Sequence, residues 1–567
     1  LLLNSIDWLC DIFFKKNNKS SNMAIGKFID DYVKTRKDLV KYLGDNESNE
    51  MGDTYYIDTS NENIQVPSVD EAGKITWNKV TALTKHLPMN SDGTSTLLLI
   101  KTRSGREVTA TKAKSFLTRK ANKLVATRGD EINVGDHIPI CQNLSNPNPI
   151  DEIDMLEYFP KTEYIHGSEI SKAKEWKNLQ NSNGKREWFK DYSGKKFVTP
   201  YSRQDSLKYV LDGNIDQVYE NECIYPKKGK NMVAKFPEKF CLDWNSGFFF
   251  GAYLAEGLST GVYTAISNND PKFWLEIIKF CDKHSFGYHI QEQKDKNQVG
   301  WTSTDVRIHS VLLAKFMVNV CNTGSSEKII PDFAYDANDD FVKGLLNGYY
   351  SGDGHVCGKY ASISATSVSK NLLVGISLLL TRFGIVSAFK TPTKIENNNR
   401  GSKNIKQHYI LTIGGGFNKV FAKKIGILTE SKMERLDNID NSRTSLYGRF
   451  DIVPNIELSS GLVNSRREDL YKMDLNDEDK EIVNGIMNSD VYYDKIISIE
   501  EVEPSHKYVY DLTVENDKTF MLSNGLLQYD TFHHTGIGNK GTASLGVPRV
   551  KELLSFSKNL KTPIMEI

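Results

Sequence analysis

The chain has 567 residues, enough for about three domains at roughly 100–200 residues each. Its 39% hydrophobic and 25% charged residues are ordinary for folded globular protein and exclude a disordered or collagen-like chain. The formal net charge of +0 excludes a nucleic-acid surface that is created by the charge of the whole molecule.

Local basic patches remain at residues 185–196 and 227–230, although a solvated loop is the favoured interpretation of each. No apolar run approaches the roughly 20 residues that a membrane span needs, and residues 1–14 lack the basic start of a signal peptide. The seven cysteines include no CxxC pair, so neither a zinc site nor a disulfide framework is indicated. We therefore expect an intracellular protein, nuclear or cytoplasmic, with no membrane partner. Because the chain begins without Met, we expect it to be part of something longer.

The N-terminal part is expected to be a domain of short strands. Its segments AIGKFIDDYV (24–33), VPSVDEAGKITWNKVTALTKH (66–86), IKTRSGREVTATKAKSFL (100–117) and EINVGDHIPI (131–140) are interpreted as alternating strands with Gly and Asp turns. Residues 142–235 then interleave lysines with aromatic residues, a composition suited to phosphate contact and stacking. This segment is either a DNA-recognition extension or a structural insert.

The middle of the chain contains an internal repeat at a constant offset of 97 residues. Self-similarity of this kind indicates duplicated structural units, here a pseudo-symmetric pair. The matched positions are Gly247/Gly344, Gly251/Gly348, Tyr253/Tyr350, Gly257/Gly354, Tyr263/Tyr360, Ile266/Ile363, Ser267/Ser364, Phe286/Phe383 and Gly287/Gly384.

Each repeat begins with a predicted apolar helix, at residues 244–256 and 341–353. Glycines four apart on one face let two helix backbones approach closely, so we expect the two helices to pack on each other. Each helix ends in an acid followed by glycine, Glu256 in the first copy and Asp353 in the second. The glycines suit left-handed C-terminal caps.

The paired acids predict a metal site. A carboxylate at the negative end of a helix dipole is unfavourable by some tenths of a kcal/mol, so a compensating cation is expected. Under a pseudo-twofold axis Glu256 and Asp353 would meet and hold Mg²⁺ for phosphodiester chemistry. The alternative is two surface acids beside ordinary helix ends. The strands after each helix could form a saddle that enters the DNA major groove.

The segments GFFFGAYLAEG and GLLNGYYSGDG resemble the two motifs of the LAGLIDADG (DOD-type) homing endonucleases found in inteins. The resemblance implies that Glu256 and Asp353 bind the catalytic metals and that the enzyme acts as a pseudo-symmetric monomer on double-stranded DNA. It further implies that Lys328, in EKIIP, and Lys432, in ESKME, assist charge stabilisation. Either lysine could equally be an exposed charge.

The C-terminal segment VYDLTVENDKTFMLSNGLLQYD, residues 509–530, predicts a β-hairpin with Asn524–Gly525 at its turn. It resembles the C-terminal splicing blocks of inteins, and the N-terminal segments resemble the other half in the same order. The expected fold is therefore mixed, an all-β Hint-type splicing domain interrupted by a two-repeat α+β LAGLIDADG domain. The expected divisions are 1–4 (N-extein), 5–141 (splicing, first half), 142–235 (insert), 236–440 (endonuclease, repeats about 244–340 and 341–436), 441–490 (connecting segment), 491–530 (splicing, second half) and 531–567 (C-extein).

Residues 531–563 resemble the trigger-loop region of the largest subunit of multisubunit DNA-directed RNA polymerases. Joining Asn4 to Thr531 restores LLLNTFHHTG, which predicts an insertion at residues 5–530. His533 matches the histidine that contacts the incoming nucleotide in that family. The resemblance implies the other polymerase subunits as partners after splicing, and the intein-less gene as the DNA target.

The intein resemblance assigns roles by position. Ser5 would attack the Asn4 carbonyl in an N-to-O acyl shift, and Thr531 would attack the resulting ester. Asp530 would then cyclise to release the joined product. Thr111 matches the residue that polarises the first scissile peptide, and Asp511 matches an acid near the second junction. No cofactor is expected for splicing.

Four positions depart from the family's usual pattern. Asp530 replaces a terminal Asn, and Tyr529, Lys114 and Lys518 replace histidines, so no imidazole is available at those positions for proton transfer. Three interpretations therefore stay open: an element active in both splicing and DNA cleavage, a splicing-impaired DNA-binding remnant, or a chain whose role is that of an RNA polymerase subunit.

Overall fold

The computed structural model describes residues 5–42, 53–90, 92–159, 165–166, 223–226, 236–294, 302–357, 362–397, 404–440 and 451–530. We call residues 5–141 together with 491–530 the β unit, and residues 236–440 the repeat unit. Five of the sequence predictions lie outside the described residues: the roles of residues 1–4, of Thr531 and of His533, and the basic patches at 185–196 and 227–230. Most of the 142–235 segment lies outside them as well.

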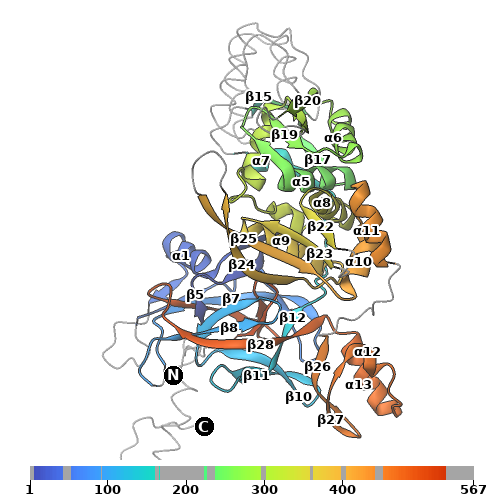
Figure 1. The fold of residues 1–567 in the computed structure, drawn as a ribbon. Coiled ribbons are helices and arrows are strands. Elements are labelled where there is room, and N and C mark those ends of the chain that lie inside the picture. The colour runs from blue at the N-terminus through green and yellow to red at the C-terminus, as the bar shows by residue number, and fades with distance from the viewer. Residues whose placement is uncertain are drawn as a thin grey trace, which may run out of the picture.

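The β unit is built on one 12-stranded sheet to which both ends of the chain contribute. Strand β28 (Val491–Val502) lies between β12 (His137–Cys141) and β8 (Leu97–Thr102), and β29 (Val509–Val514) lies beside β7 (Ile75–His86). In Figure 1 the C-terminal strand β28 accordingly runs among the blue N-terminal strands. The two halves therefore form one domain although the repeat unit separates them in sequence. The other strands are β1 (Ile6–Asp7), β2 (Asp11–Lys16), β3 (Lys19–Ala24), β4 (Val40–Tyr42), β5 (Thr54–Asp58), β6 (Ile64–Val69) and β9 (Glu107–Thr111).

A smaller four-stranded sheet contains the last two strands of the β unit. Its order is β11–β10–β31–β30, and the hairpin of β30 (Thr519–Met521) and β31 (Leu527–Tyr529) turns at Gly525, whose φ is +91°. The hairpin predicted at Asn524–Gly525 is confirmed. Because β31 also pairs with β10 (Ser115–Lys120), next to β11 (Lys123–Arg128), Asp530 is fixed directly beyond a paired strand.

One predicted strand of the β unit is wrong. Residues 24–33 were expected to be extended, but Ile25–Thr35 form helix α1. The buried residues Ile25, Phe28, Ile29 and Tyr32 recur at the spacing of one helical face and pack on the sheet. Burial of this face outweighs the β propensity of its aromatic and branched residues.

The repeat unit has two matched halves around a central helix pair, α5 (Trp244–Glu256) and α8 (Asp339–Gly352). One sheet has the order β18–β19–β21–β20 and the other β22–β23–β25–β24, so the duplicated sequence has duplicated topology. Figure 1 shows α5 and α8 side by side between these sheets, above the β unit. The strands are β18 (Gly257–Ser259), β19 (Thr264–Ser267), β20 (Tyr288–Lys294), β21 (Thr302–Ile308), β22 (Gly354–Cys357), β23 (Ser362–Ser367), β24 (Ala388–Asn397) and β25 (Asn404–Ile413), and the helices are α6 (Pro271–Lys283), α7 (Val311–Cys321), α9 (Lys370–Thr381), α10 (Phe417–Lys424) and α11 (Glu430–Asp440).

The helix pair is held together by reciprocal glycine contacts. A Cβ on Gly251 would lie 2.0 Å from the Leu345 carbonyl oxygen, and one on Gly348 would lie 2.3 Å from that of Phe248. Gly247 and Gly344 meet the opposite backbone in the same way, at 2.0 and 2.1 Å. The expected packing of the two helices is confirmed. At these glycines the backbone of one helix packs directly against the backbone of the other.

Substituting Ala for Gly251 should destabilise the repeat unit by about 1–3 kcal/mol, because the added methyl group forces the two helices apart. The matched control is Gly485→Ala in helix α13 (Asp477–Met487), where a Cβ would meet nothing within 4 Å. That change should stabilise its helix by up to about 1 kcal/mol. Thermal unfolding measures both variants, and equal stability of the two would contradict the proposed contact.

The glycines that follow the helices have a different role from the one predicted. Gly257 has φ −85° and ψ 151°, so it forms no left-handed cap, and Gly354 is not among the residues with positive φ. A Cβ on Gly257 would lie 2.4 Å from Tyr253 Cδ2, and a Cβ on Gly354 would lie 2.2 Å from the main-chain carbonyl oxygen of Tyr350. These glycines allow close passage of the chain over the last helical turn.

The connecting segment, which the sequence analysis left without an assigned structure, contains a hairpin and two helices over its described residues 451–490. No helix in the described ranges is long and apolar enough to cross a membrane. The remaining elements are β26 (Ile452–Leu458), β27 (Gly461–Arg466), α12 (Arg467–Leu470), β13 (Glu152–Asp154), β14 (Ile165–His166), β15 (Cys223–Pro226), β16 (Phe236–Pro237), β17 (Lys239–Cys241), and the 3₁₀ helices η1 (Met155–Tyr158) and η2 (Asp332–Tyr335).

Candidate functional sites

Ser5 is fully buried at the start of the short strand β1. Ile6 pairs with both Tyr510 and Ala110, which places Ser5 next to Asp511 on one side and Thr111 on the other. The Ser5 amide donates to Thr111 Oγ1 at 3.1 Å, and the Thr111 amide donates to the Ser5 carbonyl at 2.9 Å. The nitrogen of the peptide that precedes Ser5 is therefore held by a side-chain hydrogen bond, and the peptide that follows Ser5 by a main-chain one.

His86 contacts the Ser5 hydroxyl, a role that the sequence analysis missed. The Ser5 Oγ lies 2.6 Å from His86 Nε2, and His86 Nδ1 lies 2.8 Å from the carbonyl oxygen of Leu87. Burial, reinforced by the positive charge of Lys114, lowers the pKa of His86 to about 4, so the ring is neutral at pH 7. A lone histidine at the end of an alternating strand gives no sequence signal, and only the fold brings it to Ser5.

Lys114 and Asp511 form a fully buried ion pair beside Ser5. The Lys114 Nζ donates to both Asp511 oxygens, at 2.9 and 3.1 Å, and both side chains have 0% exposure. The ammonium also lies 5.0 Å from the centroid of the Phe520 ring. The ammonium of Lys114 is thus paired with the Asp511 carboxylate.

Asp530, the last residue of the β unit, is buried near the Lys114–Asp511 pair. Its Oδ2 accepts the Val514 amide at 2.6 Å, its amide donates to the Lys518 carbonyl at 2.6 Å, and its Oδ1 has no hydrogen-bond partner among the described residues. Burial and the nearby charge of Asp511 raise the pKa of Asp530 to about 8, against the opposing effect of Lys114 and Lys518. The half-buried Tyr529 precedes it, and burial raises the pKa of that phenol. The surroundings of Asp530 therefore favour the protonated form of its carboxyl.

A second cluster lies where the central helices end. Glu256 and Asp353 are both exposed residues there. The surrounding protein raises the pKa of both carboxyls, and the charge of Glu256 helps to raise that of Asp353 to about 7. The two predicted acids are thus close enough to repel each other.

Lys328 and Lys432 occupy equivalent positions at the two helix ends. The Lys328 Nζ donates to the carbonyls of Tyr253 and Leu254, at 2.8 and 3.1 Å. The Lys432 Nζ donates to those of Ser351 and Gly352, at 2.8 and 2.6 Å. Each ammonium therefore neutralises the negative end of one helix dipole next to one acid. Burial lowers the pKa of Lys328 to about 8 and also lowers that of Lys432.

The helix-end cluster fits a divalent metal by its donor chemistry. Two mutually repelling carboxylates gain from a cation between them, and Mg²⁺ is commonly held by one or two carboxylates together with phosphate oxygens and waters. Within the described ranges no group of three or more His, Cys, Asp or Glu side chains gathers. The protein would therefore supply Glu256 and Asp353, and the substrate and solvent would supply the remaining oxygens.

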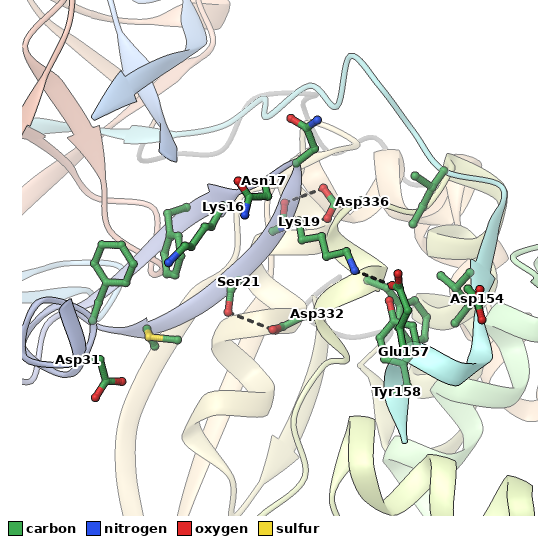
Figure 2. Close-up of a pocket in the computed structure, with 18 of the residues that line it drawn as sticks. Lys16, Asn17, Lys19, Ser21, Asp31, Asp154, Glu157, Tyr158, Asp332 and Asp336 are labelled. Atoms are coloured by element: carbon green, nitrogen blue, oxygen red, sulfur yellow. Dashed lines mark hydrogen bonds and ion pairs between the residues drawn. The ribbon is translucent and has the colours of Figure 1, made fainter. Parts of the chain in front are cut away.

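A cleft of about 900 Å³ lies elsewhere, lined by the β2–β3 hairpin and α1 of the β unit, by residues 150–158 and by η2 with Asp336 of the repeat unit (Figure 2). Ser21 Oγ donates to Asp332 Oδ2 at 3.0 Å, and Lys19 Nζ donates to Glu157 Oε2 at 2.6 Å, as Figure 2 shows. Behind them Asp336 accepts from both the amide and the hydroxyl of Ser20. None of the lining residues belongs to either cluster, so we assign to this cleft the role of a junction between the two units.

Comparison with known proteins gives three findings. The sequence profile of a family described as Intein splicing domain matches residues 18–529. The chain is 30% identical over 542 residues to the DNA-directed RNA polymerase subunit Rpo1C of Methanocaldococcus jannaschii, covering 89% of this chain and 54% of that protein. It is 26% identical over 400 residues to the DNA polymerase II large subunit of Thermococcus kodakarensis, covering 65% of this chain and 20% of that protein.

The chain thus spans about half the length of the first relative and a fifth of the second. Among solved structures, a transcription factor IIB Mvu mini-intein matches with TM-score 0.21 and 22% identity, covering 25% of this chain and 72% of that one. The homing endonuclease I-DmoI in complex with DNA and Mn matches with TM-score 0.23 and 16% identity, covering 33% of this chain and 97% of that one.

Proposed function

Because this chain belongs to the intein splicing domain family, whose profile spans most of its length, we propose that it excises residues 5–530 and joins Asn4 to Thr531. The observation that carries the proposal is the burial of both junction residues, Ser5 and Asp530, in one domain that is assembled from the two ends of the chain.

The first two steps exchange acyl groups. The Ser5 hydroxyl attacks the Asn4 carbonyl and releases the Ser5 amine, which leaves an ester. Thr111, which accepts the Ser5 amide hydrogen at 3.1 Å, holds this peptide in place. The Thr531 hydroxyl then attacks the ester carbonyl and transfers the N-terminal segment to its own oxygen.

Release at the second junction depends on Asp530. Its side-chain carboxylate attacks its own main-chain carbonyl and forms a cyclic anhydride, while the bond to the Thr531 nitrogen breaks and that nitrogen takes up a proton. Water opens the anhydride, and an O-to-N shift at Thr531 forms the final peptide bond. Because burial raises the pKa of Asp530 and favours its protonated form, we expect this step to accelerate as pH rises.

Replacing Asp530 with Asn should increase the yield of joined product at pH 7, because an amide nucleophile needs no deprotonated carboxyl. The replacement should also flatten the pH dependence of stability. An acid with a raised folded pKa binds more protons when folded, so stability of the parent falls as pH rises between about 4 and about 8. Denaturant unfolding at several pH values measures this slope. An identical slope in Asp530→Asn would contradict the burial of the group.

We further propose that the repeat unit cleaves double-stranded DNA. Glu256 and Asp353 would hold Mg²⁺, which when bound supplies charge stabilisation for the attacking and leaving oxygens of a phosphodiester. Lys328 and Lys432, each anchored on a helix end, present positive charge beside these acids. The two matched halves in one chain support action as a monomer. The test is Mg²⁺-dependent cleavage of the uninterrupted host gene, with a chelator abolishing it.

The host of the insertion is proposed to be the largest subunit of an RNA polymerase, in an intracellular setting. The similarity to subunit Rpo1C supports this assignment. After excision, the joined segment would carry His533 into the polymerase active site and associate with the other subunits.

A further inference from the structure

The imidazole of His86 is held in one tautomer. Its Nδ1 lies 2.8 Å from the Leu87 carbonyl oxygen, which can only accept, so Nδ1 must carry the hydrogen. In the neutral ring Nε2 then carries a lone pair instead of a hydrogen, and the Ser5 hydroxyl lies 2.6 Å from it. The hydroxyl therefore donates to His86, which is the arrangement of a nucleophile and its general base.

Lys114 cannot perform this function. It occupies the position where the resembling family carries a histidine, but its ammonium has no lone pair and donates to both Asp511 oxygens. His86 comes from a different strand, β7, and reaches the same hydroxyl. The pair of Lys114 and Asp511 keeps a positive charge nearby, which favours the neutral ring.

We propose that His86 is the general base and acid of the first acyl shift and replaces the imidazole that is missing at position 114. The inference rests on the proposed splicing function. His86 Nε2 takes the proton from Ser5 Oγ as that oxygen bonds to the Asn4 carbonyl carbon. The Asn4–Ser5 carbon–nitrogen bond then breaks, and the same proton passes from Nε2 to the Ser5 nitrogen. The step neither adds nor removes atoms or electrons, and its product is an ester with a free amine at Ser5.

The test isolates the first step in the full chain with Thr531→Ala, which cannot accept the acyl group. Hydroxylamine cleaves the ester, and mass spectrometry follows the release of residues 1–4. His86→Gln keeps a neutral polar side chain but cannot carry the proton, so the rate should fall by about 100-fold or more. His137→Gln, at a half-buried histidine in the same sheet, should leave the rate unchanged.

A second nucleophile separates proton transfer from positioning. A thiol ionises near pH 8.5 and needs a base far less than a hydroxyl does. With Ser5→Cys, His86→Gln should therefore lower the thiol-induced cleavage less than tenfold. The Ser5 parent should also show a solvent deuterium isotope effect that Ser5→Cys lacks, and this measurement needs no substitution at His86.

Each outcome is decisive. Equal cleavage rates for the parent and His86→Gln would overturn the role of His86 as base, although splicing itself would stand. The same conclusion would follow if His86→Gln, in folded protein, lowered the cleavage rate by the same factor with Ser5 as with Ser5→Cys. Absence of an isotope effect would overturn it even if His86→Gln did not fold. A parent that releases nothing with hydroxylamine would remove the splicing function and the inference with it.

Discussion

Replacing Asp353 with Asn lowers the rate of DNA cleavage by more than about 100-fold and leaves the repeat unit folded. Loss of an outer-shell partner of a metal already costs about 10–100-fold, and loss of a direct carboxylate ligand should exceed that range. The amide keeps the size of the side chain but removes the charge that pairs with a cation. Since the Asp353 carboxyl is destabilised by its surroundings and by Glu256, its removal should not weaken the fold.

The matched control is Asp340→Asn at the other end of the same helix. The Asp340 side chain is 75% exposed and forms an i,i+3 ion pair with Lys343. Its substitution should leave cleavage unchanged. Plasmid cleavage in Mg²⁺, with thermal unfolding of each variant, separates the effects, and full activity of Asp353→Asn would remove this residue from the metal site.

Replacing Lys114 with Met destabilises the β unit by about 3–5 kcal/mol. The change leaves the Asp511 carboxylate at 0% exposure without its cation, and breaking a buried pair in this way costs far more than the pair contributes. Asp530 lies close by, and the charge of Asp511 already raises the pKa of its carboxyl. The loss should therefore spread to the region around the second splice junction.

An exposed ion pair in the neighbouring strand provides the comparison. Lys123 and Glu71 lie 2.8 Å apart with exposures of 64% and 69%, so solvent screens their attraction. Lys123→Met should leave the denaturation midpoint nearly unchanged. A Lys114→Met midpoint that also matched the parent would show that Asp511 has no need of this cation in the folded state.

The features that the sequence predicts best are those encoded at fixed spacing. Gly251 and Gly348 identify the helix contact because a helix places every fourth residue on one face, and the repeat places Glu256 and Asp353 at equivalent ends. Lys432 does not stand at the constant repeat offset from Lys328, so the repeat alone does not predict it. Loops of different length shift the sequence position while the three-dimensional position is preserved.

Other features depend on tertiary contacts and could not be predicted in this way. The segment at α1 has short apolar spacing that fits either a strand or a helix, and only packing on the sheet decides between them. His86 belongs to no spacing pattern, because β-sheet register brings it to a serine that lies 81 positions away. The assignment of the catalytic roles remains a proposal that the variants above test.

The measurement that tests the central claim most directly is mass spectrometry of the full chain after expression. Active splicing predicts two products, the excised segment from Ser5 to Asp530 and a joined peptide that contains LLLNTFHHTG. Ser5→Ala should block both. A precursor that stays intact over prolonged incubation, in the parent and in Asp530→Asn alike, would contradict the account.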